Sequence, residues 1–326
     1  MFRFIFVRLA QSIFVMFVVS LIAFSLFRFV GDPVAQMVGQ ETSIEDQERL
    51  RERLGLNDPV PIQFARFLRD LGTGNFGFSY RTRQPIGEMF LNRMPATLEL
   101  SLVSLLISLA VGIPAGIYTA LKRGRFSSSA MLILTLVGVS VPTFVIGIFL
   151  IYIFGVQLSV LPTFGRGETI AIGWWKTNFL TVEGLRALVL PALTLGIYQL
   201  ALTMRLVRSE MLEVLRTDYI KFAVARGLNY RSIYFHHALK NSMMPVVTIV
   251  GLQLGGIIAF SIVTESVFQW PGMGLLFLES IQFVDIPVMS SYLVIIAFLF
   301  VIINLIVDLL YFVIDPRIGT ATDSQI

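Results

Sequence analysis

The 326-residue chain contains no cysteine and only two histidines, and only 14% of its residues are charged. The absence of cysteine excludes disulfide bonds and thiolate metal sites, but it does not identify the cellular compartment. Soluble domains carry roughly 25% charged residues, so this deficit indicates a surface that largely faces lipid. The hydrophobic content of 56%, the 28 phenylalanines and the mean hydropathy of +0.79 support the same interpretation.

The common signatures of catalysis are also missing. The sequence has no Gly-x4-Gly-Lys-Ser/Thr phosphate loop, no His-Glu-x-x-His metal motif and no Gly-x-Ser-x-Gly nucleophile elbow. His236 and His237 are adjacent, so on a helix they diverge by about 100° and do not face one metal ion. We expect no enzymatic activity, no bound cofactor or metal, and no nucleic-acid partner. Any uphill transport would use an ion gradient or partner subunits.

Six segments are apolar and long enough to cross a membrane as helices, which need about 20 residues each. They lie at about 9–30, 97–121, 129–157, 187–207, 243–264 and 289–313. The first follows Arg3 and Arg8 and could be a secretory signal, but its apolar run is long and no small-residue cleavage site follows it. The sequence therefore predicts an all-α polytopic membrane protein with a retained first span.

Basic residues are distributed unevenly between alternate loops, and this bias predicts orientation. With the N-terminus inside, the inner segments contain Arg3, Arg8, Lys122, Arg123, Arg125, Arg205, Arg208, Arg216, Lys221, Arg226, Arg231, Lys240 and Arg317. The two short outer loops contain only Arg166, Lys176 and Arg186. We therefore expect both termini in the cytoplasm.

In this topology the chain has four parts. They are the first span (1–30), an extracytoplasmic loop domain (31–95), a five-helix core (96–318) and a short cytoplasmic tail (319–326). The loop domain contains two helical patterns, "SIEDQERLRERLG" and "PIQFARFLRDLG". Ser43 with Asp46 resembles a capping box at the start of the first pattern.

The apolar positions of these two patterns suggest that the loop domain is a small packed cap and not an unstructured loop. The clearest examples are Leu50, Leu54, Phe64 and Leu68.

Glycine and proline recur within the predicted spans. Gly112 with Gly116, and Gly251 with Gly255, have the small-xxx-small spacing that lets membrane helices approach closely. Ordinary helix packing is the simpler interpretation. The alternative is a set of kinked helices around a path that opens and closes.

Polar side chains within the spans are costly in lipid and are therefore candidate functional groups. The candidates for a translocation path are Ser140, Thr143, Thr194, Gln199 and Gln253. Asn304 and Asp308 share one face of the last span. We expect Asp308 to pair with a loop arginine; the alternative is a role in the transport path.

A polar stretch, "YIKFAVARGLNYRSIYFHHALKNSMMP" (219–245), separates the fourth and fifth spans, and we call it the knuckle. Residues 211–226 have the pattern of one helix, which Gly227 is expected to end in a left-handed conformation. Asn229 can cap a second helix running to Pro245. This helix–turn–helix suits docking to a partner. The alternative is a solvated basic loop near anionic lipid, which the interleaved apolar residues disfavour.

The knuckle resembles the cytoplasmic "EAA" loop of ABC importer permeases, whose pattern is E-A-A-x3-G-x9-I-x-L-P. Ala223, Gly227 and Leu239 match this pattern, whereas Lys221, Phe222, His237 and Lys240 depart from it. The departures are similar to the dipeptide/oligopeptide/nickel subgroup, where "ARAKGL…RHALRNALLP" is typical. This chain reads "AVARGL…HHALKNSMMP".

Further motifs extend the resemblance over almost the whole chain. They are "GNFGFSY" (74–80), "PATLEL" (95–100), "LVLPALTLG" (188–196), "ESVFQWPGMGLL" (265–276) and "DPRIG" (315–319). In the first of these, Asn75 and Phe76 replace the Asp and Leu usual in the subgroup. The arginine-bearing N-terminus and the long first outer loop most resemble the B-type permease.

The resemblance implies a type I ABC importer in the bacterial inner membrane. This chain and a homologous second permease would form the pathway. Two cytoplasmic ATP-binding subunits would bind ATP and Mg, and an extracytoplasmic solute-binding protein would deliver the cargo. Residues of about 211–242 would form the coupling loop, with contact residues Phe222, Ala223, Arg226, Gly227, Leu228, Arg231 and Leu239. Phe222, Ala223 and Leu228 would fill a partner groove, and Arg226 and Arg231 would lie at its rim.

Peptides are the expected cargo of such a subgroup member. Glutathione, nickel complexes, opines and glycosides are alternatives carried by close relatives. An ion-driven secondary transporter would need an intramembrane ion site and usually an internal repeat, so a lone Asp308 without a repeat disfavours it. Kinked, glycine-rich helices disfavour a purely structural scaffold.

Overall fold

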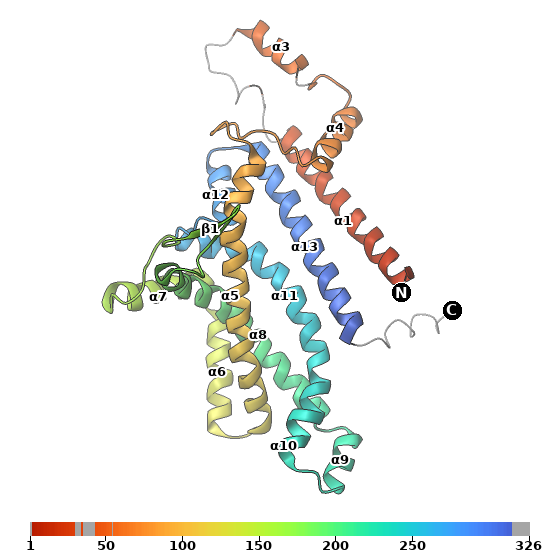
Figure 1. Ribbon diagram of the computed structural model, residues 1–326, viewed down its shortest axis with the longest axis vertical. Coiled ribbons are helices and arrows are strands. Elements are labelled where there is room, and N and C mark those ends of the chain that lie inside the picture. Colours follow the sequence, from red (N-terminus) through yellow and green to blue (C-terminus); the bar gives the residue numbers. More distant parts are fainter. Residues whose placement is uncertain (1, 30–33, 35–42, 54, 315–326) are drawn as a thin grey trace.

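The computed structural model describes residues 2–29, 34, 43–53 and 55–314, and most of these are helical. The long helices are α1 (Phe2–Phe29), α5 (Ile86–Leu121), α6 (Phe126–Ser140), α8 (Val182–Val214), α11 (Leu239–Val267) and α13 (Ile286–Ile314). They form an elongated bundle with α3 (Ile44–Arg53) and α4 (Val60–Gly72) at one end and α9 (Asp218–Ala225) at the other (Figure 1). The predicted tail and the "DPRIG" motif lie outside the described residues.

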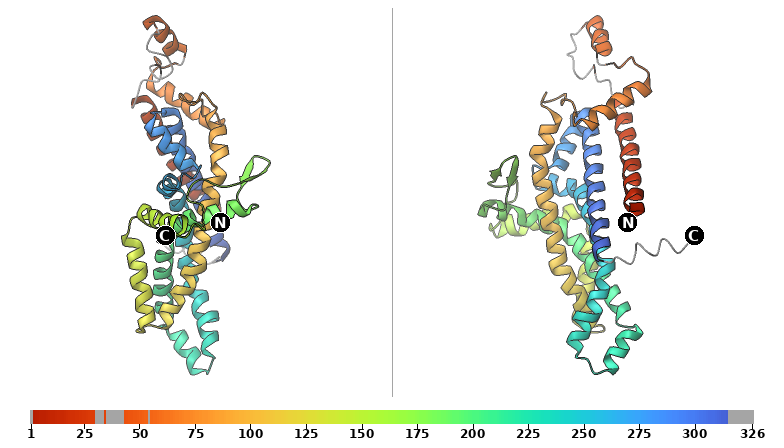
Figure 2. Two further views of the ribbon diagram at one scale, coloured as in Figure 1. Left: turned by 90° about the vertical axis from the view of Figure 1, so that its left-hand side faces the viewer. Right: turned by 45° about the vertical axis from the view of Figure 1, so that its right-hand side comes forward.

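Among the described residues, five helices are long and apolar enough to cross a membrane. A bent pair gives a sixth span if its two halves are counted together. The predicted all-α membrane fold is therefore confirmed. Figure 2 shows that α1 lies at the side of the bundle, next to α13.

The prediction of one unbroken helix over 129–157 is wrong. Helix α6 ends at Ser140, and the chain restarts at α7 (Thr143–Leu150) and η1 (Ile151–Gln157), with a bend of 105° between the halves. Pro142 explains the break, because the residue before a proline is disfavoured in helical conformation. Val141 is accordingly extended, with φ −86° and ψ 129°.

The two glycine pairs lie at close helix–helix contacts, as the packing interpretation predicted. A Cβ on Gly116 of α5 would lie 2.7 Å from the Val207 side chain of α8. Gly251 and Gly255 of α11 face Val307 and Phe300 of α13, with no room for a side chain. The small residues therefore fix the distances between α5 and α8 and between α11 and α13.

The loop domain is only partly a packed cap. The N-cap bond of the predicted capping box forms, because Ser43 Oγ accepts the Asp46 N–H at 3.2 Å; the Asp46 carboxylate accepts from the Ser43 hydroxyl at 2.7 Å. However, α3 buries none of its side chains. Helix α4 does pack, through Phe64, whose ring centre lies 5.7 Å from that of Phe17 and 5.3 Å from that of Phe24. Leu54 lies outside the described residues.

Asp308 has the structural partner that the sequence suggested, although the partner is not in a loop. Its Oδ1 lies 3.0 Å from the guanidinium of Arg8, which belongs to helix α1. The ion pair therefore joins α1 to α13.

Candidate functional site

The helix predicted to lead into the knuckle is interrupted. Residues 211–226 do not form one helix, because α8 ends at Val214 and α9 begins at Asp218. Thr217 leaves the helical conformation, with ψ 154°, and its hydroxyl donates to the Val214 carbonyl at 2.6 Å. Threonine side chains compete in this way with the backbone hydrogen bonds of a helix. The tight turn places α9 at an angle to α8, at the end of the bundle (Figure 1).

Gly227 ends α9 as predicted. Its φ is +75°, and its N–H donates to the Val224 carbonyl at 2.9 Å. The Leu228 N–H donates to the Ala223 carbonyl at 3.2 Å. These two bonds form a Schellman motif, which requires a left-handed residue. Asn229 also acts as predicted, because its side-chain oxygen accepts the Arg231 N–H at 3.1 Å.

The second half of the knuckle merges with the following span. It starts as α10 (Tyr230–Ser232), continues as the π-helix η2 (Ile233–Ala238) and becomes α11 at Leu239. The prediction that this helix stops at Pro245 is wrong, because α11 runs through Pro245 to Val267. The knuckle is therefore the end of a long helix with α9 folded back against it.

One face of α9 is buried in the chain itself. Ile220 and Ala223 belong to a cluster that also contains Val207, Met211, Ile117, Ala120, Ile233, Ala238 and Val246, and Leu239 packs against it. Only 6% of Ala223 is exposed. The expectation that Ala223 and Leu239 contact a partner therefore does not fit their positions, because both side chains pack against the chain's own core.

The other face of the knuckle is exposed and aromatic. Phe222 is 64% exposed and Tyr230 is 61% exposed, and Leu228 and Phe235 are exposed beside them in sequence. The Arg226 guanidinium lies 5.7 Å from the centre of the Phe222 ring, and Arg231 is also exposed. These exposed apolar side chains make this part of the knuckle a candidate interaction surface. Sequence reasoning missed Tyr230 and Phe235, because the pattern does not reveal which side of a short helix is covered.

The candidate path residues do not form one group. Thr194 is fully buried and donates to the Leu190 carbonyl at 2.8 Å, so it has no surface to present to a path. Ser140 is exposed and donates to the Leu136 carbonyl, and Thr143 is half-buried at the start of α7. The Oε1 atoms of Gln199 and Gln253 are buried without a hydrogen-bond partner among the described residues.

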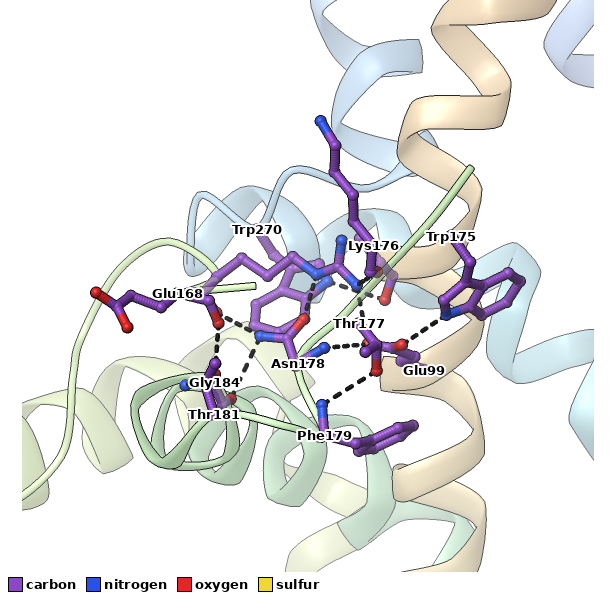
Figure 3. A network of polar contacts seen from close by, with 12 residues as sticks. Glu99, Glu168, Trp175, Lys176, Thr177, Asn178, Phe179, Thr181, Gly184 and Trp270 are labelled. Atoms are coloured by element: carbon purple, nitrogen blue, oxygen red, sulfur yellow. Dashed lines mark hydrogen bonds and ion pairs between the residues drawn. The ribbon is translucent and has the colours of Figure 1, made fainter. Parts of the chain in front are cut away.

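Sequence reasoning missed a buried polar network that anchors a β-hairpin to α5. Strands β1 (Ile170–Ile172) and β2 (Trp175–Thr177) pair antiparallel after η1. The Arg166 guanidinium lies 2.8 Å from Glu99 Oε2, and the Asn178 N–H donates to the same oxygen at 3.0 Å. Trp175 Nε1 donates to Glu99 Oε1 at 2.8 Å (Figure 3). The carboxylate thus holds three parts of the loop in place.

The arginine of this network is held in a nearly dry environment. Burial lowers the pKa of the Arg166 guanidinium, whereas the hydrogen bond to Glu99 and its negative charge act in the opposite direction. Arg166 also hydrogen-bonds to the Asn178 side chain and donates to the Lys176 carbonyl. The only sequence signal was a carboxylate inside the apolar run of "PATLEL".

A second buried carboxylate gives a structural reason for the "ESVFQWPGMGLL" motif. Glu265 is fully buried and accepts hydrogen bonds from Thr97 Oγ1 at 2.7 Å, Ser261 Oγ at 3.0 Å and the Leu275 N–H at 2.9 Å. A Cβ on Gly272 would collide with this carboxylate. The glycine therefore allows helix α12 (Met273–Gln282) to fold back against α11.

The "GNFGFSY" motif is held by a third acidic residue. Asp285, between α12 and α13, accepts hydrogen bonds from the Ser79 hydroxyl and, at 3.1 Å, from the Tyr80 N–H. Burial, together with the charge of Asp285, raises the pKa of the Tyr80 phenol. The motif thus fastens the segment after α4 to the start of α13.

Two family models together match nearly the whole sequence. Residues 112–320 match the "Binding-protein-dependent transport system inner membrane component" and residues 1–101 match the N-terminal part of the same kind of membrane component. The chain belongs to the binding-protein-dependent transport system inner membrane component family. The prediction that the chain is a permease of this kind, and a multi-pass inner-membrane protein, is therefore confirmed.

Relatives in this transport family are similar over their full length. The chain is 37% identical to the dipeptide transport system permease protein DppB of Alkalihalophilus pseudofirmus, over 95% of this chain and 97% of the relative. It is 38% identical to the di/tripeptide transport system permease protein DppB of Pseudomonas aeruginosa, over 98% and 99%. It is 40% identical to the probable D,D-dipeptide transport system permease protein DdpB of Escherichia coli, over 89% of each.

Solved structures of the MetNI methionine ABC transporter in inward-facing conformations have the same fold. One crystal form matches with a TM-score of 0.53 at 18% identity, covering 68% of this chain and 93% of the other. Another matches with a TM-score of 0.55 at 17% identity, covering 70% and 96%. The permease fold of the family is thus present in this chain.

Proposed function

We propose that this chain forms half of the translocation pathway of a peptide importer and couples to cytoplasmic ATPases through the exposed face of the knuckle. The observation that carries the proposal is the cluster of exposed aromatic side chains on a buttressed helix–turn–helix, in a chain whose sequence contains no nucleotide-binding loop. The relatives named for dipeptide and di/tripeptide transport support peptides as the cargo.

The partners follow from this role. A homologous second permease supplies the other half of the pathway, and an extracytoplasmic solute-binding protein delivers the cargo. Two cytoplasmic ATP-binding subunits bind ATP and Mg, so this chain is not itself an enzyme. The basic residues of the inner segments support a cytoplasmic knuckle and cytoplasmic termini.

The knuckle can transmit a movement of the ATPases to the spans, because one of its faces contacts the partner and the other packs against the helices of this chain. The exposed side chains of Phe222, Leu228 and Tyr230 enter the partner, while Ile220 and Ala223 hold α9 against the ends of α5, α8 and α11. Buried aromatic anchors dominate such contacts, and rim charges such as Arg226 and Arg231 contribute less. ATP shifts the conformational equilibrium only because the ATPases make unequal contacts with the two states.

The proposed path uses polar side chains of the spans. Ser140, Thr143, Gln199 and Gln253 remain the candidates for lining a path, since each retains surface or an unpaired polar atom. Glutathione, nickel complexes, opines and glycosides are the alternative cargoes, and uptake competition with unlabelled peptides would separate them.

The test of docking is Phe222→Asp in the complete complex, with Phe126→Asp as the matched control. Phe126 is 88% exposed at the start of α6, outside the knuckle. Phe222→Asp should abolish co-purification of the ATPases and binding-protein-dependent uptake of labelled dipeptides into proteoliposomes. Phe126→Asp should retain both. Normal ATPase recovery and uptake with Phe222→Asp would refute the proposed docking surface.

A further inference from the structure

Tyr219 makes a polar bridge between α9 and the start of α11. Its hydroxyl donates to the His237 carbonyl at 3.0 Å and accepts from the Asn241 side-chain amide at 2.6 Å. The partners are 18 and 22 residues further along the chain. The tyrosine is 40% exposed, so it is neither a core residue nor a free surface side chain.

The two partners lie where the helix geometry changes. His237 is in the π-helix η2, which ends at Ala238, and Asn241 is in the first turn of α11. Residues four apart lie on one face of a helix, so one hydroxyl reaches both. Short π-helical turns are frequent at functional sites. Here the π-helical turn η2 includes His237, whose carbonyl accepts the hydrogen bond from Tyr219 of α9.

The other connections of α9 differ in kind from this bridge. The turn at Thr217 links α9 covalently to α8, and the turn at Gly227 links it covalently to α10, which continues through η2 into α11. The contacts of Ile220 and Ala223 with η2 and α11 are apolar, and apolar contacts are non-directional. The exposed ion pair between Lys221 and Asp218 lies within α9 and joins it to nothing else. Within the described part of the chain, the hydrogen bonds of Tyr219 are the only polar side-chain contacts that hold α9 against η2 and α11.

We propose that Tyr219 is a positioning residue that makes α9 and α11 move as one body during transport. The inference rests on the proposed coupling role of the knuckle, and it adds which helices receive the movement of α9. A displacement of α9 by the ATPases passes to α8 through the Thr217 turn, and to α11 through the Gly227 turn and the Tyr219 hydroxyl. Without the hydroxyl, α9 remains docked on its partner but slides against α11, so ATP hydrolysis continues with less transport.

The first test is Tyr219→Phe in the reconstituted complex of both permeases, the ATPases and the binding protein. The matched control is Tyr118→Phe, because Tyr118 is also 40% exposed and also has a hydroxyl partner, Ser127, outside the knuckle. We expect normal ATPase co-purification but at least about fivefold less dipeptide uptake per ATP hydrolysed. The substitution removes two hydrogen bonds, and about 1 kcal/mol for one of them already corresponds to that factor. Tyr118→Phe should not change this ratio.

A second variant separates positioning from simple loss of stability. Asn241→Ala should lower uptake per ATP in the same way, and the Tyr219→Phe/Asn241→Ala double variant should be no worse than the poorer single variant. Additive losses, or an unchanged ratio in Tyr219→Phe, would overturn the proposal. Loss of the ATPases in Tyr219→Phe would also overturn it, because Tyr219 would then belong to the docking surface.

A distance measurement tests directly whether the Tyr219 hydroxyl holds α9 against α11. The chain has no cysteine, so spin labels can be placed at Lys221→Cys and Lys240→Cys, both exposed positions. The α9–α11 distance should be narrow and the same with and without ATP when Tyr219 is present. In Tyr219→Phe it should broaden. An equally narrow distance distribution in Tyr219→Phe would refute the positioning role of Tyr219, even if the proposed docking surface is correct.

Discussion

The guanidinium of Arg166 lies 2.8 Å from the carboxylate of Glu99, although 67 residues separate them in the chain. The two side chains are only 7% and 2% exposed. The pair fastens the hairpin after η1 to the middle of α5, and a neighbouring backbone N–H and an indole complete the coordination of the carboxylate. This loop is therefore a fixed part of the permease core.

The buried pair predicts a strong effect on stability. Glu99→Ala should destabilise the protein by roughly 3–5 kcal/mol, because it leaves the Arg166 charge buried without its partner. Glu99→Leu/Arg166→Met should cost less than the sum of its single substitutions. Thermal unfolding of the purified protein in detergent measures both effects.

An exposed ion pair provides the control for this stability prediction. Arg69, whose side chain is 72% exposed, pairs with Asp70, and exposed pairs contribute about 0–1 kcal/mol. Arg69→Ala should therefore leave the melting temperature nearly unchanged. Equal effects of Arg69→Ala and Glu99→Ala would contradict the role assigned to the buried pair.

The cost of a side chain at position 227 should depend on the backbone conformation and not on steric contacts. Nothing lies within 4 Å of a Cβ added there, but φ is +75°. Gly227→Ala should cost roughly 1 kcal/mol and Gly227→Val more, whereas Gly227→Asn should be mild, because asparagine adopts the left-handed region more readily. Co-purification of the ATPases and peptide uptake should decline in that order.

Gly124 is the matched control for the Gly227 series. It has φ +83° with open space around it and lies in the turn between α5 and α6. Gly124→Val imposes the same kind of strain outside the knuckle and should leave ATPase binding intact. If Gly227→Val retains wild-type binding and uptake, the Schellman turn is not required for coupling.

Single cysteines introduced into this cysteine-free chain should show which loops lie on each side of the membrane. Lys176→Cys is exposed in the hairpin and should react with an impermeant maleimide from outside, whereas Gly124→Cys and Asn229→Cys should not. Arg166 is unsuitable despite its place in the same loop, because it is buried. Labelling at 229 but not at 176 in cells with a permeabilised outer barrier would reverse the topology.

The two helices of the loop domain should differ in their effect on folding. Deletion of 44–53 removes α3, which buries nothing, and should leave the melting temperature unchanged while impairing uptake more than ATP hydrolysis. Phe64→Ala removes the aromatic contacts of α4 with α1. It should cost roughly 3 kcal/mol, at the low end for buried aromatic residues, because Phe64 is half-buried. Full uptake by the stably expressed deletion would show that α3 is dispensable.

Local rules were sufficient where neighbouring residues determine the conformation. Gly227, Asn229 and Ser43 occupy the cap positions that their residue types predict, because each cap bonds to groups no more than five residues away. The same rules failed at proline. Pro142 breaks its apolar run, whereas Pro245 lies inside a continuous helix. In a membrane helix, neighbouring elements can compensate the hydrogen bond that proline removes.

The sequence by itself determined the membrane class, the approximate spans and the place of the knuckle, because hydropathy and cap residues act over short distances. Its motifs indicated the family by resemblance. Only the tertiary structure decided that Ala223 faces inward while Phe222 faces outward, that Glu99 meets Arg166, and that Tyr219 joins α9 to α11. Each of these depends on which surfaces meet after the chain has folded. Contacts between residues 18 to 67 positions apart are set by helix packing, and no local propensity encodes them.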